Sequence, residues 1–156
     1  MPKVGLGVLI FNKQDEILLG KRKNSHGAAS WGPPGGHLEF GESFEECAIR
    51  ETKEETALNI TSPTFLSITN DFFEFDQKHY ISIFMSVNMP ENQKIINIEP
   101  HKVEEWGWFN LSFLPKGLFV PLENLILGKH YGSKNNLHMT LVNSAFSDID
   151  RGKMNE

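Results

Sequence analysis

Residues 35–58, GGHLEFGESFEECAIRETKEETAL, combine a glycine-rich turn with a helix that carries carboxylates where apolar residues belong. Ser43 and Glu46 form an S-x-x-E capping box, which predicts a helix that begins at Phe44. At about 100° per residue, one stripe of this helix holds apolar and acidic side chains together. The stripe consists of Phe44, Cys47, Ala48, Leu58, Glu51, Glu54 and Glu55. The opposite, solvated face holds Glu45, Glu46, Lys53 and Thr56.

Carboxylates on an inward stripe are costly, because a buried charge loses its hydration and neighbouring like charges repel. A hard divalent cation with oxygen ligands is the usual way to offset that cost. Arg50 lies about 40° from Glu54 around the helix and could neutralise one carboxylate. The alternative is an ordinary surface helix with mixed charges. The apolar residues on the stripe argue against it, because they define an inward face.

The acidic helix and its turn match a known pattern, G-x5-E-x7-R-E-U-x-E-E-x-G-U, in which U is apolar. The matching residues are Gly36, Glu42, Arg50, Glu51, Glu54, Glu55 and Leu58. On these residues the chain resembles the Nudix hydrolase superfamily. Two positions depart from the pattern: Thr52 replaces an apolar residue and Ala57 replaces glycine. Ala57 raises the question of whether the helix ends in a left-handed turn, which alanine tolerates poorly.

The similarity extends outside this box, over about residues 4–127. The segments LLGKRK, PGGHLEFGE, HYISI, EPHKVEEWGW and LFVPL are similar to those of the cytosolic, MutT-like nucleoside triphosphate diphosphatases of plants and animals. Those enzymes remove diphosphate from (d)NTPs, including oxidised or thiopurine ones, and leave the monophosphate. The resemblance implies that activity here, and also the Nudix fold, an α/β/α sandwich with a mixed β-sheet.

A carboxylate cluster suits Mg²⁺ or Mn²⁺ rather than Zn²⁺, since the chain has no Cys/His set of tetrahedral spacing. A backbone carbonyl of Gly35 or Gly36 would be a sensible additional ligand. The resemblance implies roles for the five charged residues of the box. Glu51 and Glu55 are expected as direct ligands, Glu54 as a further ligand or general base, Glu42 as completing the shell, and Arg50 as orienting the glutamates.

The resemblance also implies a nucleotide pocket lined by Arg22, His37, Ser82 and Phe119. Phe119 could stack on a base, as aromatic faces do. Each of three residues also has a purely structural interpretation: Arg22 could lie on a solvated hairpin end, Phe119 in the core, and His37 in a loop hydrogen bond.

Three departures bear on base preference. Gly32 stands where the resembling enzymes have Gln, Val120 where they have an aromatic residue, and His101 where they have Glu. Glu99 or Glu104 could supply the carboxylate that His101 lacks.

The remaining pattern predicts strands and helices around the acidic helix. Apolar runs and alternation predict strands at 4–11, 17–22, 58–68, 79–87 and 106–109. We expect helices at 111–114, 121–131 and 137–146, an irregular segment at 31–36 and a loop or hairpin tip at 70–77. Strands on both sides of one helix predict a mixed sheet between helical layers. We expect one Nudix domain over residues 1–146 and a disordered tail over 147–156.

The composition of 156 residues, 39% hydrophobic and 22% charged, is that of one globular domain. A net charge of −5 argues against nucleic-acid binding, which needs a basic patch, but not against a small nucleotide. The single Cys47 excludes an internal disulfide. The absence of a signal peptide and of a transmembrane run predicts a cytoplasmic protein that does not bind membranes. The resemblance implies a possible homodimer.

These observations predict metal-dependent hydrolysis of (d)NTP to (d)NMP and diphosphate, which would clear damaged nucleotides from the pool. Two alternatives remain open. One is a Nudix hydrolase of another diphosphate, such as ADP-ribose or an isoprenyl diphosphate. The other is a non-catalytic nucleotide sensor, against which the complete set of acidic residues in the box argues.

Overall fold

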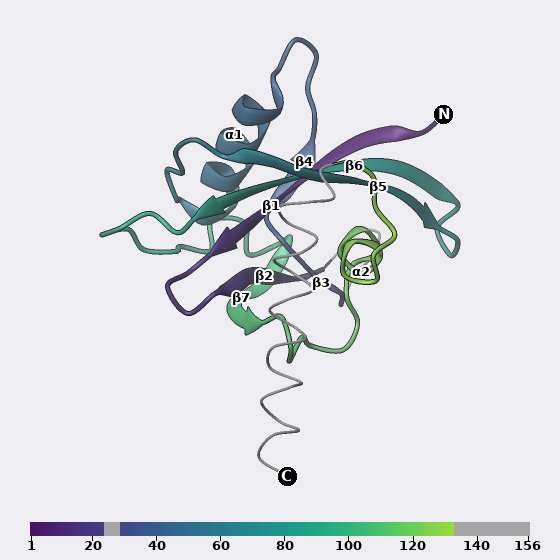
Figure 1. Cartoon of the computed structure of the whole chain (residues 1–156). Helices are drawn as coiled ribbons and strands as arrows, with labels where there is room; N and C mark the ends of the chain where they lie inside the picture. Colours follow the sequence, from purple (N-terminus) through teal and green to yellow (C-terminus); the bar gives the residue numbers. More distant parts are fainter. Residues whose placement is uncertain (24–28, 133–156) are drawn as a thin grey trace.

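The computed structural model describes residues 1–23 and 29–132 of the chain (Figure 1). The expected helix at 137–146, the domain end at 146 and the tail lie outside these residues. The elements in order are β1 (Lys3–Phe11), β2 (Glu16–Arg22), β3 (Trp31–Gly32), β4 (Gly35–His37), α1 (Phe44–Thr56), β5 (Thr64–Phe73), β6 (Lys78–Asn88), β7 (Val103–Asn110) and α2 (Val120–Ile126). None of the helices in the described part is both long and apolar enough to span a membrane.

The strands form one mixed sheet in the order β3-β2-β1-β6-β5, with β4 also paired to β1 and β7 to β2. β1 runs parallel to β6, and the other pairs are antiparallel. Figure 1 shows α1 and α2 on opposite sides of the central strands. The predicted fold class, a mixed sheet between helical layers, is therefore confirmed.

Alternation along β1 divides the core between the two helical layers. Leu6, Val8 and Ile10 pack in one cluster with Cys47 and Ala48 of α1. Leu9 packs in a second cluster, which includes Leu122 and Leu125 of α2. Each fully buried leucine stabilises the fold by about 1.5–3 kcal/mol. Both faces of β1 are thus covered, which is why residues 4–11 are an apolar run.

The helix α1 begins where the capping box predicts. The Ser43 hydroxyl accepts from the Glu46 N–H at 3.0 Å, and the Glu46 carboxylate accepts from the Ser43 N–H at 3.4 Å. The helix ends at Thr56, and Ala57 adopts a left-handed conformation with φ of 66°. Alanine therefore occupies the turn that glycine normally makes.

The predicted orientation of α1 is partly wrong. Phe44 is 38% exposed, although it was assigned to the buried stripe, and Thr56 is fully buried, although it was assigned to the solvated face. Leu58 is buried as predicted, but it follows the left-handed turn at Ala57, so its angle on the helical wheel has no meaning. The buried face follows Cys47, Thr52 and Thr56 instead.

Several element boundaries differ from the sequence prediction. Residues 31–36 are not wholly irregular, because β3 pairs with β2 and β4 with β1. β5 extends to Phe73, because its end pairs with the start of β6. Residues 111–114 form a turn rather than a helix, since the Ser112 N–H donates to the Asn110 side chain at 2.8 Å. α2 stops at Ile126, two residues before Gly128, whose φ is 80°.

Candidate active site

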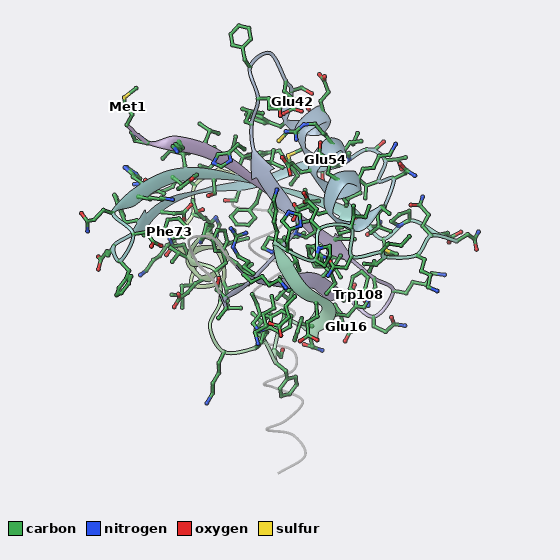
Figure 2. The ribbon with its side chains drawn as sticks, turned by 180° about the vertical axis from the view of Figure 1, so that it is seen from behind. Met1, Glu16, Glu42, Glu54, Phe73 and Trp108 are labelled. Carbon is green, nitrogen blue, oxygen red and sulfur yellow. The ribbon has the colours of Figure 1, made fainter. Side chains whose placement is uncertain are left out.

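A cavity of about 570 Å³ opens between the acidic helix and the sheet. It is lined by parts of β1, β4, α1 and β6, and by segments near Glu99 and Phe119. Seven of the residues predicted for the site line it: Gly35, Glu51, Glu55, Arg22, His37, Ser82 and Phe119. The other three, Glu42, Arg50 and Glu54, lie beside it; Figure 2 shows Glu42 at the start of α1 and Glu54 further along that helix.

Arg50 hydrogen-bonds to several of the acidic residues at once. Its guanidinium donates to both carboxylate oxygens of Glu42 at 2.6 and 3.0 Å, to Glu51 at 2.7 Å and to Glu54 at 3.4 Å. It also donates to the His37 carbonyl at 3.1 Å, which joins α1 to β4. The bidentate hydrogen bond from Arg50 lowers the pKa of Glu42 to about 2. Arg50 thus hydrogen-bonds to Glu42, Glu51 and Glu54 at once, and its role in orienting them for catalysis stays a prediction.

Glu55 and Glu51 face the cavity in a different environment. The Gly35 N–H donates to Glu55 Oε1 at 2.8 Å, yet burial raises the pKa of Glu55 to about 8. Burial also raises the pKa of Glu51, although Arg50 acts in the opposite direction. A Cβ atom on Gly36 would lie 2.3 Å from the Glu51 carboxyl carbon, so only glycine leaves room for that side chain. These two carboxylates are buried without full charge compensation.

The donor set suits a hard divalent cation, though the predicted ligands separate into two groups. Glu51 and Glu55 line the cavity, whereas Glu42 and Glu54 do not; Glu51 hydrogen-bonds to Arg50, as Glu42 and Glu54 do. Among residues 1–23 and 29–132, no three His, Cys, Asp or Glu side chains converge as a ready-made metal cluster. Glu99 also lines the cavity, and its charge helps to raise the pKa of Glu51 and Glu55. A cation held by these carboxylates would offset the desolvation and, secondarily, the repulsion that raise the pKa values of Glu51 and Glu55.

Another part of the cavity lining is aromatic and hydrogen-bonding. The Arg22 guanidinium lies 4.0 Å from the centre of the Phe119 ring, and Phe73 packs against Phe119 at 5.4 Å. His37 Nε2 lies 3.1 Å from the Tyr80 hydroxyl. The structure therefore brings the four residues implied for the nucleotide pocket into one cavity with two of the glutamates.

The positions that depart from the resembling enzymes are also located. Gly32 lies against Phe119, because a Cβ there would meet that side chain at 3.1 Å. Of the two substitutes for a glutamate at 101, Glu99 lines the cavity, whereas Glu104 lies 3.5 Å from Lys21 in an ion pair.

Sequence reasoning missed the basic lining and one buried acid. Lys3, Lys23, Lys78 and Lys102 line the cavity from four different segments, so no local pattern marks them. Asp71 of β5 is fully buried and hydrogen-bonded to Ser82. In the sequence, Asp71 was marked only by its charge, because the other residues of this strand are uncharged.

The NUDIX domain family model matches residues 1–126. The chain belongs to this family. The MutT NUDIX hydrolase of Burkholderia pseudomallei has a similar structure, with a TM-score of 0.70 and 30% identity over 76% of this chain and 91% of that one. The Nudix assignment made from the acidic box is thus confirmed.

Two curated Nudix relatives have different names. An ADP-ribose pyrophosphatase of Methanocaldococcus jannaschii is 33% identical over 70% of this chain and 63% of its own length. An RNA pyrophosphohydrolase of Hydrogenovibrio crunogenus is 26% identical over 78% of this chain and 77% of its own length. The chain therefore spans less than two thirds of the first relative, and the narrower resemblance to nucleoside triphosphate diphosphatases stays a prediction.

Proposed function

We propose that this Nudix protein hydrolyses (d)NTPs to (d)NMPs and diphosphate with the help of Mg²⁺ or Mn²⁺. One observation carries the proposal: a single cavity is lined by Glu51 and Glu55 and also by Ser82 and Phe119. A molecule that joins phosphates to a flat heterocycle has the chemistry for both pairs of residues, with its phosphates at the glutamates and its heterocycle at Phe119. Lysines in the lining would attract the phosphates.

At the phosphate end, Glu51 and Glu55 would hold the cation, with the Gly35 carbonyl as a further ligand. When bound, the cation would neutralise phosphate charge and lower the pKa of a coordinated water. Arg50 would keep Glu51 in orientation through its 2.7 Å hydrogen bond. Glu42, held by both of its oxygens, would fix Arg50 in turn.

A general base must accept the proton of the attacking water. We propose a glutamate of α1 for this role, with Glu54 as the residue implied by the resemblance. Glu54 does not line the cavity; its side chain is 53% exposed and hydrogen-bonds at 3.4 Å to Arg50, which also binds Glu51, so it would have to turn toward Glu51 to reach the reacting water. Replacing Glu54 by Gln tests this assignment, because a base contributes about 10²–10⁴-fold to the rate.

At the other end, Phe119 and Arg22 would hold the base. The guanidinium already covers one face of the phenyl ring at 4.0 Å, which makes a planar, cationic platform. His37 and Ser82 would supply hydrogen bonds. Arg22 covers one face of the Phe119 ring, and the small residue Gly32 lies beside that ring. This arrangement favours recognition of a base by its shape, with modest discrimination among bases.

A second candidate substrate is ADP-ribose, which the 33% identical archaeal relative favours by its name. Both reactions break a diphosphate linkage, so the products separate them. We further propose that the protein acts in the cytoplasm on free nucleotides, possesses no nucleic-acid surface, and functions as a homodimer.

The test is a substrate panel of (d)NTPs, oxidised dGTP, ADP-ribose and isopentenyl diphosphate with Mg²⁺, with products separated by chromatography. We expect (d)NMP and diphosphate from the triphosphates, loss of turnover after chelation, and recovery with added Mg²⁺ or Mn²⁺. Faster turnover of ADP-ribose than of every triphosphate would favour the second candidate. Full turnover after exhaustive chelation would refute the metal-dependent proposal.

A further inference from the structure

The Ser82 hydroxyl donates its only proton in a hydrogen bond to a buried carboxylate. Ser82 lies on β6, lines the cavity and is 6% exposed. Its Oγ donates to Oδ2 of Asp71 at 2.5 Å. Asp71 lies on the neighbouring strand β5, is fully buried and does not belong to the cavity lining. The carboxylate therefore stands behind Ser82, on the side away from a bound molecule.

The carboxylate of Asp71 is itself fixed by two further donors. The Thr69 hydroxyl donates to Oδ2 at 3.0 Å, and the Asn124 amide donates to Oδ1 at 2.9 Å. Together with Ser82, these hydrogen bonds engage both carboxylate oxygens. A carboxylate only accepts, so each of its neighbours must donate. Asp71 thus determines the direction of the hydrogen bond that it shares with Ser82.

A serine hydroxyl has one proton and two lone pairs. Because the Ser82 hydroxyl donates its proton in a hydrogen bond to Asp71, it can present only lone pairs to the cavity. The opposing residue on β1 is Gly5, which leaves this oxygen accessible: a Cβ there would be 3.8 Å from Ser82 Oγ. The cavity lining therefore contains a buried acceptor, Ser82 Oγ, whose lone pairs are left for the cavity because its proton is donated to Asp71.

We propose that Asp71 is a positioning residue that makes Ser82 an obligate hydrogen-bond acceptor, so that the pocket selects bases with an N–H donor at that point. This inference rests on the proposed binding of a nucleotide. The ligand class is a purine with an amino group or a ring N–H facing Ser82. A base without that donor would leave the lone pairs of Ser82 buried and unpaired, which weakens binding at least about tenfold.

The experiment measures dissociation constants by calorimetry for nucleoside monophosphates, which report base binding independently of turnover. The bases are guanine, hypoxanthine, adenine and unsubstituted purine. Guanine and hypoxanthine differ in the 2-amino group, adenine and purine in the 6-amino group, and hypoxanthine and purine in the N1–H together with the 6-oxo group. In the wild type, we expect one of these three pairs to differ by about tenfold or more.

The variants test the direction of the hydrogen bond. In Ser82→Ala, the ratio of the discriminating pair should fall to about one, because the acceptor is gone. In Asp71→Asn, the amide N–H₂ can donate to Ser82, whose proton then turns toward the cavity, so the same ratio should fall about tenfold or invert. Thr69→Val is the matched control: it removes another hydroxyl from Asp71 without touching the cavity, and it should preserve the ratio. A purely structural role for Asp71 would weaken all four ligands equally.

Two failures are distinguishable. If the protein hydrolyses nucleotides but Ser82→Ala and Asp71→Asn both keep the wild-type ratios, the inference is overturned and the proposed function stands. If the ratios shift as expected but no nucleoside triphosphate is hydrolysed, the proposed function fails and the role of Asp71 stands. Should Asp71→Asn fail to fold, Ser82→Ala alone still decides, because unchanged ratios in that variant contradict the proposal.

Discussion

The backbone N–H of Gly35 donates a 2.8 Å hydrogen bond to Oε1 of Glu55, which joins the glycine turn to the acidic helix. The contact has little tolerance for change, because a Cβ on Gly35 would lie 2.0 Å from the Leu6 carbonyl oxygen. The turn and the strand β1 therefore touch backbone to backbone directly beside the carboxylate. Five predictions follow from this arrangement and its surroundings.

Gly35→Ala should destabilise the fold by several kcal/mol, since a backbone oxygen cannot move aside as a flexible side chain can. Gly5→Ala is the control, because a Cβ there meets its nearest atom at 3.6 Å, an ordinary contact. Urea unfolding of both variants without metal checks this. Equal stability of the two variants would contradict the close approach of β4 to β1.

Glu55 should make the metal-free protein less stable as the pH rises. Its pKa is about 8 in the folded protein against 4.5 for the ordinary group, so the folded state holds more protons between these values. The free energy of unfolding should fall from about pH 4.5 to pH 8 and then level off. Glu55→Gln should remove most of this slope, whereas Glu45→Gln, on the exposed face, should keep it. Unfolding curves in chelator across this range provide the test.

Magnesium should reverse the effect of the same substitutions. Without metal, Glu51→Gln and Glu55→Gln should equal or exceed the wild type in melting temperature, because they relieve repulsion and desolvation. With Mg²⁺, the wild type should gain stability through linkage, and both variants should gain much less and lose most activity. Glu45→Gln should behave as the wild type throughout. Loss of activity in Glu45→Gln with retention in Glu55→Gln would contradict the site assignment.

Arg50→Lys should lower kcat by about tenfold or more although the charge is kept. An ammonium cannot bridge Glu42, Glu51, Glu54 and the His37 carbonyl in the way that the planar guanidinium does. Glu42 should then lose the cause of its low pKa of about 2, so a titration of its carboxyl by NMR should shift upward. Lys53→Arg, on the exposed face, is the control and should leave both measurements unchanged.

Ala57→Gly should stabilise the protein by up to about 1 kcal/mol, because glycine adopts positive φ without strain. The residue has a φ of 66° at the end of α1. The matched control is Lys53→Gly in the exposed helix interior, which should destabilise by about 1 kcal/mol. Thermal unfolding of both variants decides the matter; destabilisation by Ala57→Gly would show that the left-handed turn is not strained.

The start of α1 could be predicted from the sequence because a capping box is local: Ser43 and Glu46 satisfy each other's backbone groups within one turn. It was harder to predict from the sequence which face of the helix is buried. The helical wheel depended on Phe44, which projects to solvent, and on Leu58, which lies beyond the left-handed turn. Both residues drew the predicted inward stripe away from Thr56, which is fully buried.

The rest of the site depends on contacts between distant segments. Lys3, Lys78 and Lys102 meet at the cavity only because the sheet aligns their segments, and no spacing in the sequence records this. Asp71 and Ser82 are diagonal neighbours on β5 and β6, since Asp71 pairs with Tyr80 and Ser82 with Thr69, so their hydrogen bond depends on side-chain orientation that the spacing in the sequence does not record. The short strands β3 and β4 likewise exist only through their partners β2 and β1.

The parallel pairing of β1 with β6 has a consequence for how the protein is made. Residues 3–11 leave the ribosome well before their ladder partners, residues 80–88. Until β6 is synthesised, the apolar first strand has only hairpin and β4 contacts, and its closure over so long a loop is slow. The part of the cavity lining to which both strands contribute therefore assembles after the acidic helix has been made. A nascent chain that stops short of β6 would hold the carboxylates of the family box without a complete cavity.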